Sequence, residues 1–143
     1  MENSKFEIQV GYSGTPLAKK LGIKPGFKLM LVNAPDHYLN LFTDLPPDTI
    51  FTQNLAELKD VIHFFVKDKA EYTAQLLQLK PQIVQNGSIW VSWPKKASKI
   101  PTDITEDFIR NYALDNGLVD VKVCAVDEVW SGLKLVIRLK DRV

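Results

Sequence analysis

Apolar positions along the chain form short runs, and segments with helical spacing lie between them. Residues 27–32, 61–66 and 88–93 are predicted strands, and the second is almost entirely apolar, as in a strand buried on both faces of a sheet. Residues 69–85 carry apolar side chains on one side of a predicted helix, and residues 103–115 do the same after a capping box. This alternation predicts parallel strands joined by helices.

The ends of the chain extend this pattern. Thr15 and Pro16 open a short predicted helix before the first strand, as its N-cap and its first residue. Residues 121–126 and 133–139 alternate in polarity around the turn at Trp130, so they form an antiparallel pair. We therefore expect a single α/β domain over residues 1–143. Its predicted architecture is a three-layer, mostly parallel Rossmann-type sheet of five to six strands with a C-terminal antiparallel strand.

The amino-acid composition argues against several classes of function. Eighteen basic and seventeen acidic residues leave a net charge of +1, so nucleic acid is not an expected partner. One cysteine excludes an intramolecular disulfide, and two histidines with no Cys/His cluster argue against a metal site. The chain shows neither an apolar leader nor a run of about 20 apolar residues, so we expect a cytoplasmic protein without membrane contact.

The turn after the first predicted strand lacks glycine. Asn33-Ala34-Pro35-Asp36 stands where nucleotide-binding α/β proteins need glycines to let the backbone approach the ligand, and the chain contains no G-x-G. On this ground no cofactor is expected, S-adenosylmethionine included.

The helix–strand order over roughly residues 61–140 resembles the C-terminal half of class I S-adenosylmethionine-dependent methyltransferases, in a truncated and degenerate form. The resemblance implies a methyltransferase-like fold. The chain departs from those enzymes at the glycine turn and at two further places. Phe65-Val66-Lys67-Asp68 replaces an (Asp/Asn)-Pro-Pro-Tyr turn, and Thr52-Gln53-Asn54 replaces an acidic ribose ligand.

Three segments look like signatures of a bacterial family of small proteins catalogued as a domain of unknown function. They are GYSGTPLAKKLG at residues 11–22, WVSWPKK at 90–96 and VDEVWSGLK at 126–134. The resemblance runs over nearly the whole chain and implies a bacterial protein of similar size, with no activity attached.

The loop after the strand at 88–93 holds the sharpest candidate site, for an anionic small molecule. Three lysines would neutralise the anion, three hydroxyls would orient it and a tryptophan would pack on it. The predicted set is Trp93, Lys95, Lys96, Ser98 and Lys99, with Ser13 and Thr15 opposite. A solvated lysine-rich loop and an ordinary helix cap are the competing interpretations.

The remaining polar residues give no catalytic set. His63 lies between apolar neighbours in a strand and is interpreted as a structural histidine. His37 beside Asp36 could exchange protons, but no nucleophile accompanies them. Asp127 and Glu128 are adjacent and therefore point to opposite faces of a strand.

Three functions stay open. The first is a non-catalytic bacterial protein that binds an anionic small molecule or a protein partner. The second is a divergent methyltransferase-like enzyme that lacks the glycine turn. The third is a structural protein that forms a homodimer through an exposed edge strand at 133–139.

Overall fold

The computed structural model describes residues 14–143, so Ser13 and the first signature's opening residues lie outside the described part of the chain. The described residues form six strands: β2 (Lys28–Val32), β3 (Ile50–Phe51), β4 (Lys59–Phe65), β5 (Ile83–Pro94), β6 (Leu118–Ala125) and β7 (Trp130–Ile137). The α-helices are α1 (Leu17–Leu21), α2 (Lys69–Leu79) and α3 (Glu106–Asp115). Short 3₁₀ turns are η1 (Tyr38–Leu41), η2 (Lys80–Gln82), η3 (Lys96–Ser98) and η4 (Leu139–Asp141).

The strands form one sheet in the order β3-β2-β4-β5-β7-β6. Strands β2, β3, β4 and β5 are parallel, and β7 runs antiparallel to both β5 and β6. This confirms the predicted mostly parallel α/β sheet with an antiparallel C-terminal strand. The expectation that residues 133–139 form an exposed edge is wrong, because β7 is paired on both sides.

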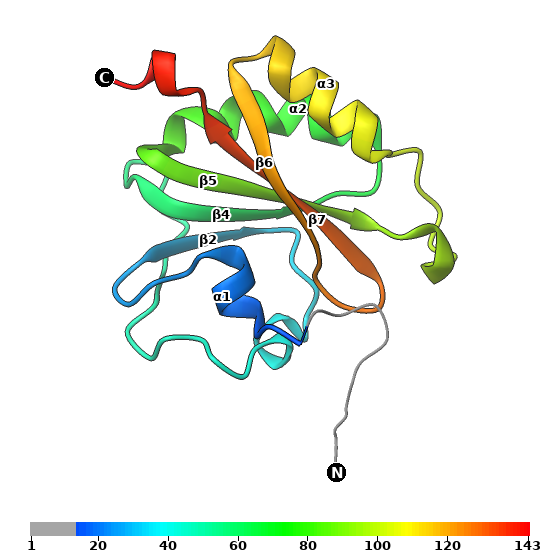
Figure 1. Ribbon diagram of the computed structural model, residues 1–143, viewed down its shortest axis with the longest axis horizontal. Helices are drawn as coiled ribbons and strands as arrows, with labels where there is room; N and C mark the ends of the chain where they lie inside the picture. The colour runs from blue at the N-terminus through cyan, green and yellow to red at the C-terminus, as the bar shows by residue number, and fades with distance from the viewer. Residues whose placement is uncertain (1–13) are drawn as a thin grey trace.

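Each face of the sheet has its own apolar core (Figure 1). Helices α2 and α3 cover one face, where Phe64, Tyr72 and Ile109 are fully buried. The short α1 and the η1 turn cover the other face, over Trp90 and Phe65. The indole Nε1 of Trp90 donates a hydrogen bond to the Leu21 carbonyl at 2.9 Å, which fastens α1 to the middle of the sheet.

Several element boundaries differ from the sequence-based prediction. The helix expected over 69–85 ends at Leu79, because Pro81 lacks the N–H that would continue it and η2 follows. Strand β5 begins at Ile83 and runs through the expected turn at 86–87. A Cβ at Gly87 would lie 3.0 Å from the Asp60 carbonyl, so this glycine permits close approach of two backbones beside a register shift.

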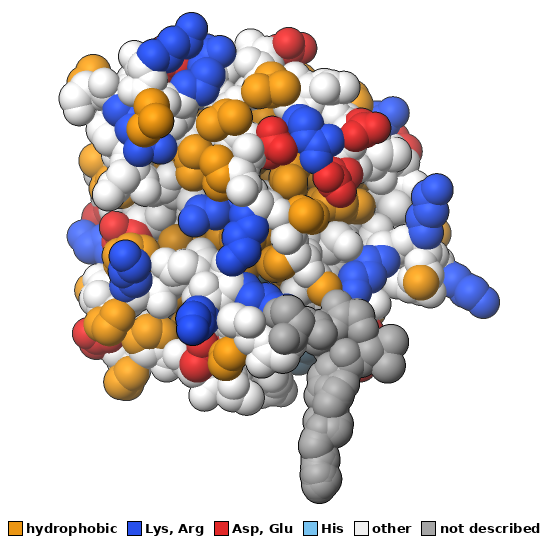
Figure 2. Space-filling model, viewed as in Figure 1, with side chains coloured by type: hydrophobic (Ala, Val, Ile, Leu, Met, Phe, Trp, Pro, Cys, Tyr) orange, Lys and Arg blue, Asp and Glu red, His pale blue; other side chains and the backbone are white. Residues whose placement is uncertain are grey.

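Charged side chains of both signs are spread over the face shown in Figure 2. Arg110 illustrates the pairing: its Nη1 lies 2.9 Å from Asp107 and its Nε lies 2.9 Å from Asp120, while Glu106 binds the remaining Nη2. Around Arg110, acidic side chains therefore neutralise the basic one. No helix within residues 14–143 is long and apolar enough to cross a membrane.

Candidate functional site

The sheet reverses its strand order between β2 and β4. From β2 the chain proceeds outward to β3, whereas from β4 it proceeds the other way to β5. Ligands of open α/β sheets bind at the carboxyl ends of the strands beside such a reversal. A crevice of about 400 Å³ opens there, which we call the switch-point crevice. It is lined by Asn33, Pro35, Phe65, Val66, Lys67, Asp68, Glu71 and Trp130.

Asn33 supplies the left-handed turn that glycine was expected to supply. Its φ is +58°, in the region where asparagine is the best tolerated residue after glycine. The side-chain Nδ2 donates to the Phe65 carbonyl at 3.2 Å and to Glu71 Oε2 at 2.7 Å. The end of β2 is thus tied to the end of β4 and to α2 across the floor of the crevice.

Two carboxylates and an aromatic pair form the walls of the crevice. The Asp68 carboxylate accepts a hydrogen bond from the Glu71 N–H at 2.7 Å and caps α2, so it is held in place at the end of β4. The Trp130 ring meets the Phe65 ring edge-on, with centroids 5.0 Å apart. The lining therefore combines these two carboxylates and the Lys67 ammonium with an apolar wall.

A buried polar chain lies beneath the crevice. Tyr38 Oη is 2.9 Å from His63 Nδ1, and His63 Nε2 is 2.7 Å from Ser92 Oγ. The His63 ring stacks on Phe65 with centroids 4.3 Å apart. Burial lowers the pKa of His63 to about 3, so the ring is neutral at neutral pH. His63 is fully buried, as expected of a structural histidine, and it contacts no hollow among those described.

The loop after Trp93 folds partly onto itself. Trp93, Lys95 and Lys96 line a separate hollow of about 470 Å³, where Asp103 and Glu106 bring opposing negative charge. Trp93 is only 8% exposed because it packs into the core below α2 and α3, so little of its ring is available for stacking. Anion binding in this hollow stays a prediction.

The other loop residues are engaged locally. Ser98 Oγ donates to the Lys95 carbonyl at 2.6 Å and accepts from the Ile100 N–H at 3.3 Å. Lys99 takes a left-handed φ of +61° and ends η3. The hydroxyl and the third lysine thus shape the turn.

Thr15 lines a third hollow, of about 270 Å³, next to Lys20 and Asp127. The N-cap position of α1 is Pro16 and not Thr15 as expected. The amide groups of Ala18 and Lys19 donate to the Asp44 carboxylate, at 2.9 and 3.1 Å. The protein's own carboxylate therefore occupies the helix start where an anion was predicted. The turns at 33–36, at Thr15 and after Trp93 line three hollows and not one.

Other acid–base candidates are dispersed. The imidazole Nε2 of His37 lies 3.8 Å from the Asp127 carboxylate. Within residues 14–143, His37 forms no hydrogen bond or ion pair with Asp36. Within residues 14–143 no group of three or more His, Cys, Asp or Glu side chains could hold a metal ion. The site residues predicted from the sequence do not include Asn33, Glu71 or Trp130. Of these, Asn33 had a usable signal, since asparagine directly after a buried strand favours a left-handed turn.

Comparison with solved structures places this fold among methyltransferases. A putative type 11 methyltransferase from Sulfolobus solfataricus superposes with a TM-score of 0.62 at 12% identity, covering 89% of this chain and 92% of that one. Magnesium protoporphyrin IX methyltransferase from Synechocystis PCC 6803 with bound SAM gives 0.56 at 13% identity, covering 85% and 74%. The DhpI–SAH complex gives 0.57 at 9% identity, covering 87% and 83%.

These structures correct the expectation that the chain has no cofactor and that S-adenosylmethionine is excluded. Proteins with bound SAM or SAH share its fold, so the missing glycine does not separate this chain from cofactor-binding members of the fold. The physical reason for the error is Asn33, whose left-handed φ provides the turn geometry without glycine.

Family membership follows from the sequence itself. No curated protein matches the chain. The pattern of the family described as "Protein of unknown function (DUF3052)" matches residues 41–139, which is well over half of the chain and takes in the strands β3 to β7. With its methyltransferase-like sheet and its switch-point crevice, the chain belongs to the DUF3052 family of proteins of unknown function.

Proposed function

We propose that this protein is a small-molecule-binding domain that holds a ligand of the S-adenosylmethionine class in the switch-point crevice. The observation that carries the proposal is the crevice itself, which lies where the strand order reverses between β2 and β4. Two similar structures contain SAM or SAH by their descriptions, which supports this ligand class.

The residues present fit such a ligand in most respects. S-adenosylmethionine carries ammonium and sulfonium charges, and the carboxylates of Asp68 and Glu71 suit them. Phe65 and Trp130 offer an apolar wall. At the end of β3, Gln53 donates to the Leu31 carbonyl at 3.0 Å, and its own amide oxygen is an acceptor suited to a ribose hydroxyl. An uncharged amide thus stands where the methyltransferases that the chain resembles carry an acidic ribose ligand.

The Asn33 bridge is what the ligand must displace. The Asn33 Nδ2 donates a hydrogen bond to Glu71 Oε2 at 2.7 Å, and a ligand ammonium would compete for the same oxygen. When bound, a ligand of this class supplies an activated methyl group, which is the chemistry of the divergent-methyltransferase alternative. The chain's own residues orient the ligand, and the small accessible part of the buried Trp130 ring contacts one side of it.

Isothermal titration with S-adenosylmethionine tests the proposal. We expect a dissociation constant of about micromolar size for the full chain. Glu71→Gln keeps an acceptor for Asn33 but removes the charge, so we expect at least about tenfold weaker binding. Asp48→Asn removes an exposed carboxylate outside the crevice and is the matched control. Absence of binding, or equal binding by the Glu71 variant, would overturn the proposal.

The hollow beside Trp93 supports a second candidate, an anionic small molecule held by Lys95 and Lys96. The double variant Lys95→Ala, Lys96→Ala should abolish phosphate-induced NMR shifts of the amides at 95–99 without unfolding the domain. Undiminished shifts in that variant would show that these lysines only solvate the loop.

A further inference from the structure

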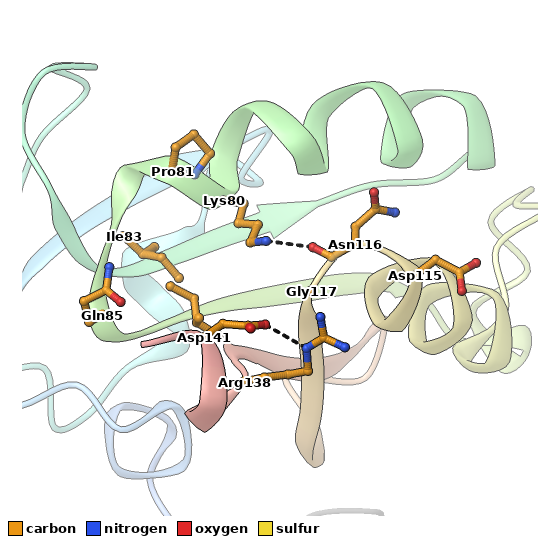
Figure 3. A pocket seen from close by; sticks show the side chains of 10 residues that line it. Lys80, Pro81, Ile83, Gln85, Asp115, Asn116, Gly117, Arg138 and Asp141 are labelled. Atoms are coloured by element: carbon orange, nitrogen blue, oxygen red, sulfur yellow. Dashed lines mark hydrogen bonds and ion pairs between the residues drawn. The ribbon is translucent and has the colours of Figure 1, made fainter. Parts of the chain in front are cut away.

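A hollow of about 630 Å³ lies where α2 and α3 end and where β5 and β6 begin (Figure 3). We call it the basal hollow. The switch-point crevice lies at the other end of the parallel strands. Its lining includes Lys80, Ile83, Gly117, Ile137, Arg138 and Asp141. The sequence analysis assigned no role to these residues, and the proposed function does not use them.

Two cationic side chains meet over Gly117. A Cβ placed on this glycine would lie 2.5 Å from Lys80 Nζ and 3.7 Å from Arg138 Nη2. The Lys80 ammonium therefore fills the space next to Gly117, and the Arg138 guanidinium borders the same space. The missing side chain of residue 117 leaves room for both cations, and its φ of +83° also favours glycine. Figure 3 shows both side chains directed to this point from different elements.

Both cations are held in place by one hydrogen bond each. Arg138 Nε donates to Asp141 Oδ2 at 2.9 Å, and Lys80 Nζ donates to the Asn116 carbonyl at 2.9 Å. Across residues 14–143, no described hydrogen bond uses the two Nη groups of Arg138. The guanidinium fork and two ammonium hydrogens of Lys80 thus remain as donors toward the hollow.

The acidic side chains that line the basal hollow do not cover the donors of Lys80 and Arg138 beside Gly117. Asp141 binds the Nε side of Arg138, which orients the fork instead of covering it. Asp115 is exposed, and Figure 3 shows its side chain directed away from Lys80 and Arg138. Buried Ile83 and Ile137 give the hollow an apolar floor.

We propose that the basal hollow binds the phosphate group of a small phosphorylated molecule between Lys80 and Arg138, over Gly117. Six N–H donors remain, four on the Arg138 fork and two on Lys80, which is more than the about four lone-pair sites of a carboxylate, and a phosphate group has a further oxygen to accept them. The body of the molecule lies on Ile83 and Ile137. The competing explanation is structural: Lys80 caps the carbonyl end of α3, and Gly117 ends that helix.

Titration of the ¹⁵N-labelled full chain with inorganic phosphate at constant ionic strength tests the proposal. We expect the Gly117 amide signal to shift to saturation, and acetate at equal concentration to produce no saturating shift there. Arg138→Gln should weaken phosphate binding at least tenfold. The exposed Lys140 does not line the hollow, so Lys140→Gln is the matched control and should bind as the unaltered chain does.

A linear, non-saturating response of Gly117 would overturn the proposal, as would equal weakening by Lys140→Gln. Acetate binding as tight as phosphate would overturn the phosphate assignment. The spectrum of the Arg138 variant outside the hollow reports its folding, and Lys80→Met gives an independent second loss of charge. Titration of Arg138→Gln with S-adenosylmethionine should match the unaltered chain, which separates this site from the switch-point crevice.

Discussion

At the scale of single residues, Asn33 decides how the first strand-to-helix turn is made. The residue combines a left-handed backbone with a side chain that links β2 to β4 and α2. A glycine would provide the backbone conformation alone. The side chain therefore adds a hydrogen-bonded closure to the place where this fold binds ligands.

Substituting Asn33 separates these two roles. Asn33→Gly and Asn33→Ala both remove the bridging amide, but only alanine is penalised at a φ of +58°. We expect the alanine variant to be less stable than the glycine variant by about 1 kcal/mol in urea unfolding. An alanine variant at least as stable as the glycine variant would show that this turn is not left-handed.

The buried His63 makes the free energy of unfolding depend on pH. Its pKa is about 3 when folded and about 6.5 in an unfolded chain, so only the unfolded state takes up this proton between those values. The neutral ring stabilises the fold fully above about pH 6.5, and that contribution falls as the pH is lowered toward 3, by up to about 1.4 kcal/mol per pH unit. NMR titration of the ring should show no protonation of His63 down to about pH 4 while the protein is folded. A His63 midpoint near 6.5 in the folded protein would contradict the burial.

At the scale of elements, the two faces of the sheet are stabilised differently. Helices α2 and α3 begin with side-chain caps from Asp68 and Thr105 and pack over a continuous apolar core. Helix α1 has only five residues and no side-chain cap at its N-cap residue. It depends instead on the Asp44 carboxylate and on the Trp90 indole, both distant in sequence.

Removal of the Asp44 carboxylate should therefore loosen α1. Asp44→Ala leaves two amide groups of the first turn without this acceptor, and we expect a loss of about 1 kcal/mol in the free energy of unfolding. Hydrogen exchange of the Ala18 and Lys19 amides should accelerate. Asp48→Ala, four residues away and exposed, is the control. Unchanged exchange at Ala18 would mean that Asp44 does not hold the helix.

At the scale of the whole molecule, periodicity predicted the class of fold because the central strands are continuous apolar runs. Strand β4 and helix α3 follow directly from their patterns. The pattern at residues 49–52 also predicts a short strand, and β3 is present there with two residues paired to β2. The place of β7 inside the sheet depends on contacts between distant segments and was missed, because β6 covers its outer side.

The candidate sites were harder to predict for the same reason. Thr15 was expected opposite the loop after Trp93, yet the two line separate hollows, since α1 is capped by Asp44 and the Trp93 ring is buried in the core. Glu71 and Trp130 come to the crevice from α2 and β7. Their sequence neighbourhoods carry no ligand motif, so only the fold reveals their proximity.

The most direct test of a ligand site at the sheet reversal is an NMR titration of the labelled full chain with S-adenosylmethionine. A ligand bound there should cause saturating shifts of the Asn33 side-chain amide, the Glu71 amide and the Trp130 indole, because these residues all line the switch-point crevice. Absence of shifts at about 1 mM ligand, or shifts confined to residues 95–99, would contradict this ligand site.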